Sequence, residues 1–423
     1  MWAQFSGPAI LSRGEAPAAM AAPNIQFRPF VEFSGVYDTG LSDARLTDTG
    51  TLASGASSGL RVTGGVSGVK SWKFTTVGIE YQGSYTGYRA QAIPRSFSQS
   101  LLLGVSRQLS RHVNLNLRES AGMFTRDFGL AGLSQTVPFD PSSSFIPTTD
   151  YFDNRTYYSS SQAQVTWQKS MRLSMNMAGA FLTNQRSSKS LYSMTGETAQ
   201  GDIQYRVTRM STVGALYEYE RYNYRNDVGG TDIHIFAGSF SIRPTRRLEF
   251  SMVGGVARLE SKFLLALTVD PVIAQLLGIT TTAQIVHTIA DRPYGEARLS
   301  RVFARGVVYV SGGTGMTPGN GVFLTSYSTR IMGGYQYTGL RRWSFSAQGG
   351  GDWEESTGNA SGRYGGATGS VTVSRSLGRS AHLTSSLSAR QYNSPDFSQY
   401  NRLIYSFTVG IGFTPGNLPL RIR

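Results

Sequence analysis

The chain of 423 residues contains no cysteine and no long uninterrupted hydrophobic run. Without cysteine there are no disulfides, no thiolate nucleophiles and no cysteine-based metal sites. The most apolar stretch, Phe263 to Ile279, is broken by Asp270, Pro271 and Gln275. A membrane-spanning helix needs about 18 or more consecutive apolar residues, so we predict none in this chain.

Histidine is also scarce, and the H-E-x-x-H zinc motif is absent. The four histidines are His112, His234, His287 and His382. We expect no enzyme activity, no cofactor and no bound metal. Because serine is abundant, a catalytic serine–histidine pair remains an open alternative.

Alternation of apolar and polar residues is the main pattern that is present. It is strict in Val113–Arg118, Leu173–Met177, Trp343–Gln348 and Tyr405–Phe413. A period of two indicates a β-strand with one apolar and one polar face. Repeated over some eighteen strands, the polar face is too extensive for a side-chain-filled interior. The pattern favours a barrel whose polar face lines water and whose apolar face meets lipid.

Short basic turns punctuate these strands at regular intervals. They lie near residues 70, 109, 169, 207, 244, 304, 340 and 377, so most intervals are near 37 residues and two are near 60. Each interval corresponds to a β-hairpin plus a longer loop, and the two long ones locate enlarged loops at 126–154 and 260–291. We predict an all-β, antiparallel up-and-down transmembrane barrel of about 18 strands (16–18), with both chain ends on the short-turn side.

The repeat runs without a linker, which predicts one barrel domain over residues 29–414. Residues 1–28 are expected to be a periplasmic segment or the remnant of a signal, and residues 415–423 a short periplasmic tail. Met1 to Ala22 lacks the basic start and apolar stretch of a secretory signal; only Ala18 to Ala22 resembles a cleavage site. Either the start is misplaced or an upstream part is missing, and a periplasmic domain is one candidate for that part.

The last predicted strand carries Thr408, Gly410 and Phe413 in a spacing similar to the C-terminal insertion signal of outer-membrane barrels. Over essentially its whole length the chain resembles bacterial outer-membrane β-barrels of the porin kind. One departure is that Thr414 to Arg423 follow the aromatic residue. The resemblance implies a place in the outer membrane, contact with its lipids and lipopolysaccharide, recognition by the barrel-assembly machinery, and short turns facing the periplasm.

The formal net charge is +14, and about fifteen of the 40 Lys and Arg residues lie in the short turns. There we expect contact with anionic headgroups rather than with nucleic acid. The bases predicted on the lumen face are Arg118, Arg258, Arg298, Arg330 and Arg390. The acids predicted there are Glu80, Asp202, Glu218, Glu249, Glu296 and Asp352. Both signs suit an aqueous lumen, and an excess of positive charge would favour anions.

The two enlarged loops have different expected roles. In general porins the loop at the first position folds inward, so the resemblance implies a constriction. Its acids Asp127, Asp140, Asp150 and Asp153 would then face Arg118 and Arg126. The alternative is an outward, solvated loop. The second loop is apolar and predicts short amphipathic helices or an added hairpin that plugs the mouth, packs on a neighbouring subunit or touches the outer leaflet. A self-packed lid is the remaining alternative.

The expected function is passive diffusion of small hydrophilic solutes; a preference for anions is one alternative, and a polar lumen without such a preference is the other. An export channel for an acidic exopolysaccharide, which requires a periplasmic partner, is a second hypothesis. A plugged structural or adhesive barrel is a third. The sequence leaves open whether the chain forms a homo-oligomer.

Overall fold

The computed structural model describes residues 25–39, 55–89, 95–125, 155–187, 191–225, 229–268, 281–319, 324–340, 342–357, 362–378, 380–396, 398, 401–415 and 418–420. The first strands are β1 (Ile25–Asp38), β2 (Ser57–Ser71), β3 (Thr75–Tyr88), β4 (Ser96–Gln108), β5 (Val113–Thr125) and β6 (Arg155–Gln168). They are followed by β7 (Leu173–Arg186), β8 (Met194–Arg206), β9 (Ser211–Tyr224), β10 (Gly229–Thr245), β11 (Leu248–Thr268) and β12 (Thr281–Phe303). The last are β13 (Gly306–Thr317), β14 (Ser326–Leu340), β15 (Trp343–Ser356), β16 (Arg363–Ser376), β17 (Ala381–Asn393), β18 (Arg402–Phe413) and β19 (Leu418–Leu420).

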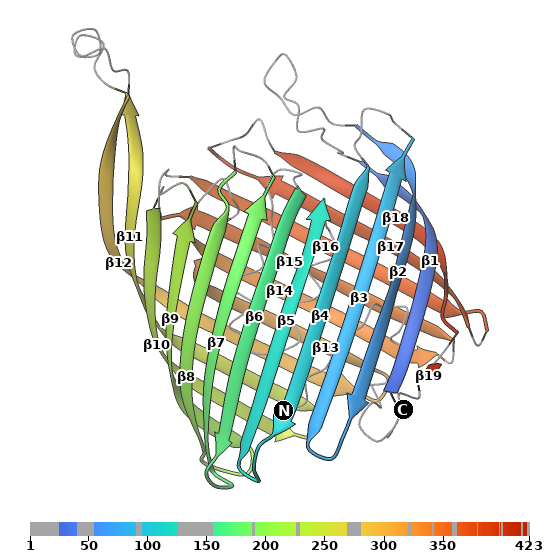
Figure 1. The fold of residues 1–423 in the computed structure, drawn as a ribbon, viewed down its shortest axis with the longest axis horizontal. Helices are drawn as coiled ribbons and strands as arrows, with labels where there is room; N and C mark the ends of the chain where they lie inside the picture. The colour runs from blue at the N-terminus through green and yellow to red at the C-terminus, as the bar shows by residue number, and fades with distance from the viewer. Residues whose placement is uncertain are drawn as a thin grey trace.

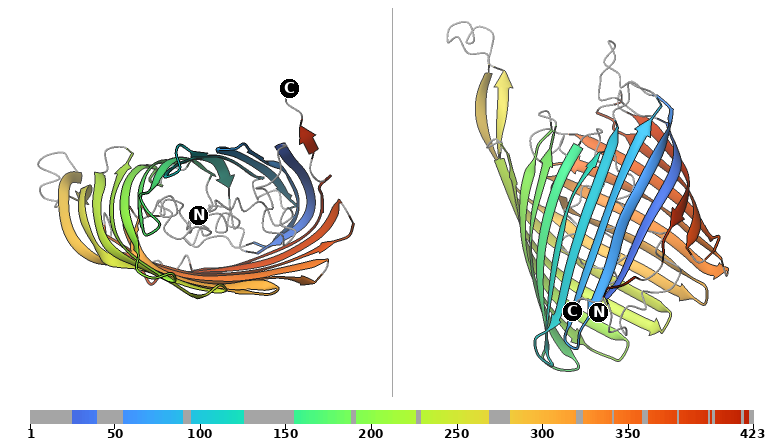
Figure 2. Two further views of the ribbon diagram at one scale, coloured as in Figure 1. Left: turned by 90° about the horizontal axis from the view of Figure 1, so that it is seen from below. Right: turned by 45° about the vertical axis from the view of Figure 1, so that its right-hand side comes forward.

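Strands β1 to β18 form a closed antiparallel barrel. Each pairs with the next along the chain, and β1 pairs with β18, with Val31 opposite Phe413 and Asp38 opposite Ser406. Figure 1 shows the tilted strands, and Figure 2 shows the oval section of the barrel from below. The predicted all-β, 18-strand fold is confirmed, and the predicted short turns all fall between consecutive strands at one end.

The outward face of the barrel is apolar. On β18, Tyr405, Phe407, Val409, Ile411 and Phe413 are 39–48% exposed, whereas the alternate residues Ile404 and Ser406 are buried. Exposed aromatic residues gather in two rows. The row near the loop end includes Tyr37, Tyr85, Phe97, Tyr157 and Trp353, and the row near the turn end includes Trp72, Phe74, Trp167, Tyr205 and Phe413. Two aromatic girdles that bound an apolar belt fit a lipid bilayer, so the barrel spans a membrane.

Within the described ranges, the structure has no helix that is both long and apolar enough to cross a membrane.

The barrel sheet extends beyond both boundaries expected from the sequence. Strand β1 begins at Ile25, and its first residues pair with β2, Gln26 lying opposite Val69. Near the C-terminus, β19 pairs with the same end of β1, with Leu418 opposite Phe27. Phe413 lies opposite Val31, so the five residue steps from Phe413 to Leu418 span the same length as the four residue steps from Val31 to Phe27 of β1. The extra residue indicates a bulge between β18 and β19.

The longest strands, β11 and β12, form a hairpin that rises beyond the rim (Figure 1). Strand β12 pairs with β13 only from Gly295 onward, whereas residues 281–294 pair with β11 alone. The apolar segment 260–291 is therefore largely this hairpin, which confirms the added-hairpin alternative; residues 269–280 lie outside the described residues. The first enlarged loop, 126–154, also lies outside them.

Candidate functional site: the charged lumen

The lumen face consists of the residues that alternate with the apolar belt. Its bases are Arg28, Arg61, Arg118, Arg186, Arg298, Arg330, Arg390 and Arg402. Its acids are Glu32, Asp38, Glu80, Asp202, Glu218, Glu220, Glu249, Glu296, Asp352 and Glu354. Neither sign dominates on this described wall.

The structure places the predicted lumen bases Arg118, Arg298, Arg330 and Arg390 on this face. The prediction was wrong for Arg258, which is exposed on the outward face between the buried residues Ala257 and Leu259. Near the loop end of β11 the inward positions are apolar because they belong to a buried cluster. Near the loop end of β11 the apolar residues therefore point inward and the charged Arg258 points outward. This is the reverse of the prediction, which placed the charged residue in the lumen.

Other predicted site residues fall in two groups. Arg126, Asp127, Asp140, Asp150 and Asp153 lie outside the described residues, so the inward first loop stays a prediction. The predicted insertion-signal residues Thr408, Gly410 and Phe413 all lie in the closing strand β18, where Thr408 pairs with Val36 of β1 and Phe413 with Val31. Their role in assembly also stays a prediction.

A row of charges crosses β12, β14 and β15 on the inner wall. Glu296 pairs with Gly313, Gly313 with Arg330, and Arg330 with Asp352. Because Gly313 has no side chain, the Arg330 charge acts on the Glu296 carboxylate across β13. A Cβ at Gly313 would lie 3.3 Å from Glu296 Cγ. The absence of a side chain at Gly313 therefore makes space for the row of Glu296, Arg330 and Asp352.

A diagonal acid–base pair lies on β3 to β5, on another part of the wall. Arg118 of β5 pairs with Gly104 of β4, and Glu80 of β3 lies one strand further on, opposite Leu102. The Arg118 charge acts on the Glu80 carboxylate across that glycine. Alternating signs on facing strands keep charged side chains hydrated in a lumen without a large net field.

Near the closure of the barrel, short hydrogen bonds order the polar wall. Thr384 Oγ1 donates to Glu32 Oε1 at 2.6 Å, across β17, β18 and β1. Arg61 Nε donates to Thr86 Oγ1 at 3.0 Å. Charge-assisted bonds of this kind hold side chains in fixed positions against the wall.

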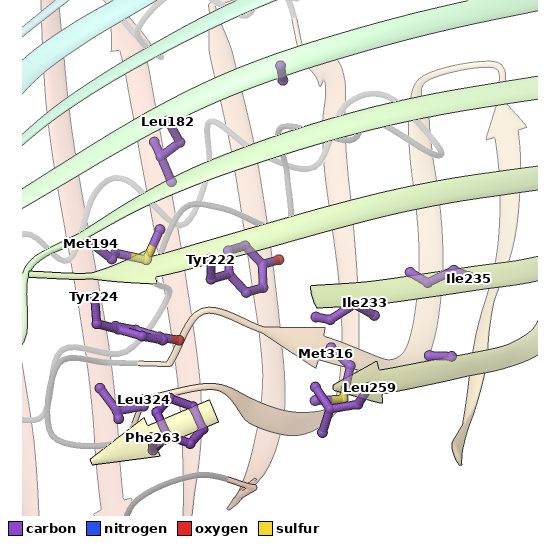
Figure 3. Close-up of a cluster of buried hydrophobic side chains, with 12 residues drawn as sticks. Leu182, Met194, Tyr222, Tyr224, Ile233, Ile235, Leu259, Phe263, Met316 and Leu324 are labelled. Atoms are coloured by element: carbon purple, nitrogen blue, oxygen red, sulfur yellow. The ribbon is translucent and has the colours of Figure 1, made fainter. Parts of the chain in front are cut away.

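The connection from β13 to β14 is an element that the sequence did not reveal. Leu324 of this connection and Met316 at the end of β13 are buried in a cluster with inward residues of β7 to β11, such as Leu182, Tyr222 and Leu259 (Figure 3). The cluster also contains Ala180, Met194, Tyr224, Ile233, Ile235, Ala257 and Phe263. The connection therefore packs on the inner side of the wall near the loop end.

Hydrogen bonds fix this connection to the wall. Tyr224 Oη donates to the Pro318 carbonyl at 3.2 Å, and Thr325 Oγ1 donates to Thr231 Oγ1 at 2.7 Å. Thr357 of the next connection donates its backbone N–H to the Thr325 carbonyl at 3.0 Å. In the sequence, an apolar residue such as Leu324 within a polar, glycine-rich connection could have indicated that this connection packs against the wall.

Two observations bear on metal binding and on a serine nucleophile. Within the described residues, no group of three or more His, Asp or Glu side chains is arranged to hold a metal. Gly55 to Gly59 has the G-x-S-x-G spacing, but Ser57 opens strand β2 and its hydroxyl donates to the Ser58 carbonyl. A hydrolase nucleophile requires a strand-to-helix turn instead.

No protein-family model matches the chain, and no curated protein matches it. Among solved structures, it is similar to the ferric-catecholate import receptor Fiu from E. coli K12, with 8% identity, a TM-score of 0.46, and 93% of this chain and 82% of that chain covered. It is also similar to Pseudomonas aeruginosa OpdQ, with 9% identity, a TM-score of 0.42 and coverages of 94% and 98%. At this level the likeness concerns architecture alone. The closed barrel and its apolar, aromatic-bounded belt make the chain an outer-membrane β-barrel.

Proposed function

We propose that the protein is a pore through which small hydrophilic solutes cross the outer membrane by diffusion. The observation that carries this proposal is the lumen wall, where charged and hydroxyl side chains alternate with the lipid-facing belt around the barrel. A barrel of this strand number exceeds the size at which side chains fill the interior. A wall of this kind holds water and so supports permeation of polar solutes.

We further propose that the pore selects weakly between anions and cations. The described wall carries both signs in similar numbers, and basic turn residues such as Arg172 and Arg246 account for part of the net charge of +14. Charges in the turns lie at the membrane surface, where salt screens them. An anion preference, as expected from the net charge, therefore requires a contribution from residues outside the described wall.

Lipid and assembly partners complete this proposal. The apolar belt fits acyl chains of outer-membrane lipids and lipopolysaccharide, and the C-terminal strand fits recognition by the barrel-assembly machinery. These contacts rest on the belt and on the spacing of Thr408, Gly410 and Phe413.

Single-channel recording of the refolded protein in planar bilayers, with a KCl gradient, tests the proposal. A pore gives steady open steps and a reversal potential near zero. A heat-modifiable, folded barrel that stays silent would refute passive diffusion and favour a plugged barrel or an exporter gated by a periplasmic partner. In that case we would next delete the β13–β14 connection and repeat the recording, because this connection packs on the inner side of the wall.

A further inference from the structure

Glu119 of β5 is a carboxylate on the lipid-facing side of the barrel. It pairs with Leu103 of β4, which is 37% exposed, and with Ser161 of β6, which is also exposed. Paired residues on neighbouring strands project to the same face. Glu119 therefore points outward with the belt, away from the lumen.

Its depth is well inside the belt. At the turn end, Val113 of the same strand pairs with the girdle residue Trp167, and at the loop end Met123 pairs with the girdle residue Tyr157. Glu119 is six residues from the first and four from the second. At about 3.3 Å per residue, these separations are about 20 Å and 13 Å along the strand. Ionisable side chains facing hydrocarbon are costly and rare, and they mark functional contacts.

On the β6 side of Glu119 the nearest outward residues are small, and two are polar, whereas Leu103, Leu117 and, beyond Ser161, Phe181 are large and exposed. Ser159 and Ser161 lie beside it on β6, followed by Ala163 on the same strand and Gly179 on β7. On the far side of the barrel Ile331 of β14 and Val310 of β13 are likewise exposed in the belt, at 52% and 50%. Small outward residues such as Ser161, Ala163 and Gly179 let another protein backbone approach closely within a membrane.

We propose that the outward face of β5 and β6 is an interface with a second copy of this chain. In it the Glu119 carboxylate of one copy accepts hydrogen bonds from the Ser159 and Ser161 hydroxyls of the other. Two copies in one membrane with the same orientation are related by an axis along the membrane normal, which keeps every residue at its own depth. Ser161 lies in the register row of Glu119 and Ser159 in the next row on the same face, so the donors lie at nearby depths.

The donor–acceptor pattern favours a second copy over other occupants. A two-fold interface uses the same patch twice, so the patch must complement itself. One carboxylate acceptor beside two hydroxyl donors satisfies that condition. Acyl chains supply no hydrogen-bond donor for the carboxylate. A different protein would bring its own donors to Glu119, and the hydroxyl donors beside Glu119 on this chain would then have no role in the interface.

The cysteine-free sequence makes a direct test possible. We would introduce Ser161→Cys into the full chain, oxidise it in native outer membranes, and compare it with Ile331→Cys, an equally lipid-facing site on the far side. The expected result is a covalent dimer of twice the chain mass for Ser161→Cys and none for Ile331→Cys. Equal crosslinking at both sites, no dimer at Ser161, or a product of another mass would overturn the proposal.

A second pair of variants separates the contact from folding. Glu119→Leu should convert the dimer to a monomer in native mass spectrometry, whereas Glu119→Gln, which keeps an acceptor, should remain dimeric. Both variants should keep the heat-modifiable gel shift of a folded barrel. If folded Glu119→Leu stays dimeric, Glu119 does not hold the interface and the proposal fails. If Glu119→Leu does not fold, the crosslinking comparison decides.

Discussion

The row Glu296, Arg330 and Asp352 permits a quantitative test of the lumen. Arg330→Gln removes the positive charge between two acids while keeping a polar side chain of similar size. An ion that passes about 7 Å from this site, in water at 0.1 M salt, feels about 0.3 kcal/mol from one unit charge. Because RT is about 0.6 kcal/mol, this energy raises the permeability to cations and lowers the permeability to anions by about 1.6-fold each. The cation-to-anion permeability ratio should rise two- to threefold, that is, by about the square of this factor.

The assay is the reversal potential of single channels under a KCl gradient. Arg258→Gln is the matched control, because it removes the same charge from the outward face. We expect no change in the permeability ratio for Arg258→Gln and no change in the number of conducting channels for either variant. An unchanged ratio for Arg330→Gln, or an equal shift for both variants, would show that ions do not pass along this wall.

Three further predictions concern stability and gating. Gly65→Ala should lower the free energy of unfolding by about 1–3 kcal/mol in denaturant titrations in lipid vesicles, because the new Cβ would lie 2.6 Å from Phe30 Cε1; Gly369→Ala, with nothing within 4 Å, should be neutral. Leu324→Ala, at a fully buried site, should cost about 2–5 kcal/mol locally and free the β13–β14 connection, seen as added open-channel current noise; unchanged noise would contradict the packing described. A hydrogen bond from Lys262, and a weaker effect from a hydrogen bond with His287, lower the pKa of Glu260 on the projecting hairpin. The stabilisation of the hairpin by these contacts is therefore complete above the ordinary glutamate pKa, and it is lost as the pH falls through the lowered pKa of Glu260. Protection of the hairpin amides, measured relative to the intrinsic exchange rate at each pH, should decrease at that acidic pH, and Glu260→Gln should abolish this extra pH dependence.

The sequence predicted the strands and turns well because both depend on local chemistry. Alternation over stretches such as Tyr405–Phe413 reports which face meets lipid, and basic turns report where the chain reverses. The same locality explains the failures. Arg258 was misplaced because buried apolar neighbours at Ala257 and Leu259 depend on a distant segment, the β13–β14 connection. Likewise, no local pattern shows that Gly313 leaves room between Glu296 and Arg330, since the three residues meet only through strand register.

The hairpin of β11 and β12 has one border with no neighbour. Over residues 281–294, the backbone of β12 is paired with β11 and, within the described residues, with no other strand. From Ala283 to Ala290 this border has neither proline nor a formally charged residue, and Ile285 and Ile289 are 70% and 53% exposed. Unpaired amides and carbonyls on such a border are a template for another extended chain. Outside the bilayer, concentrated protein should therefore associate through this hairpin first, and a lysine in place of Ile285 should delay that association.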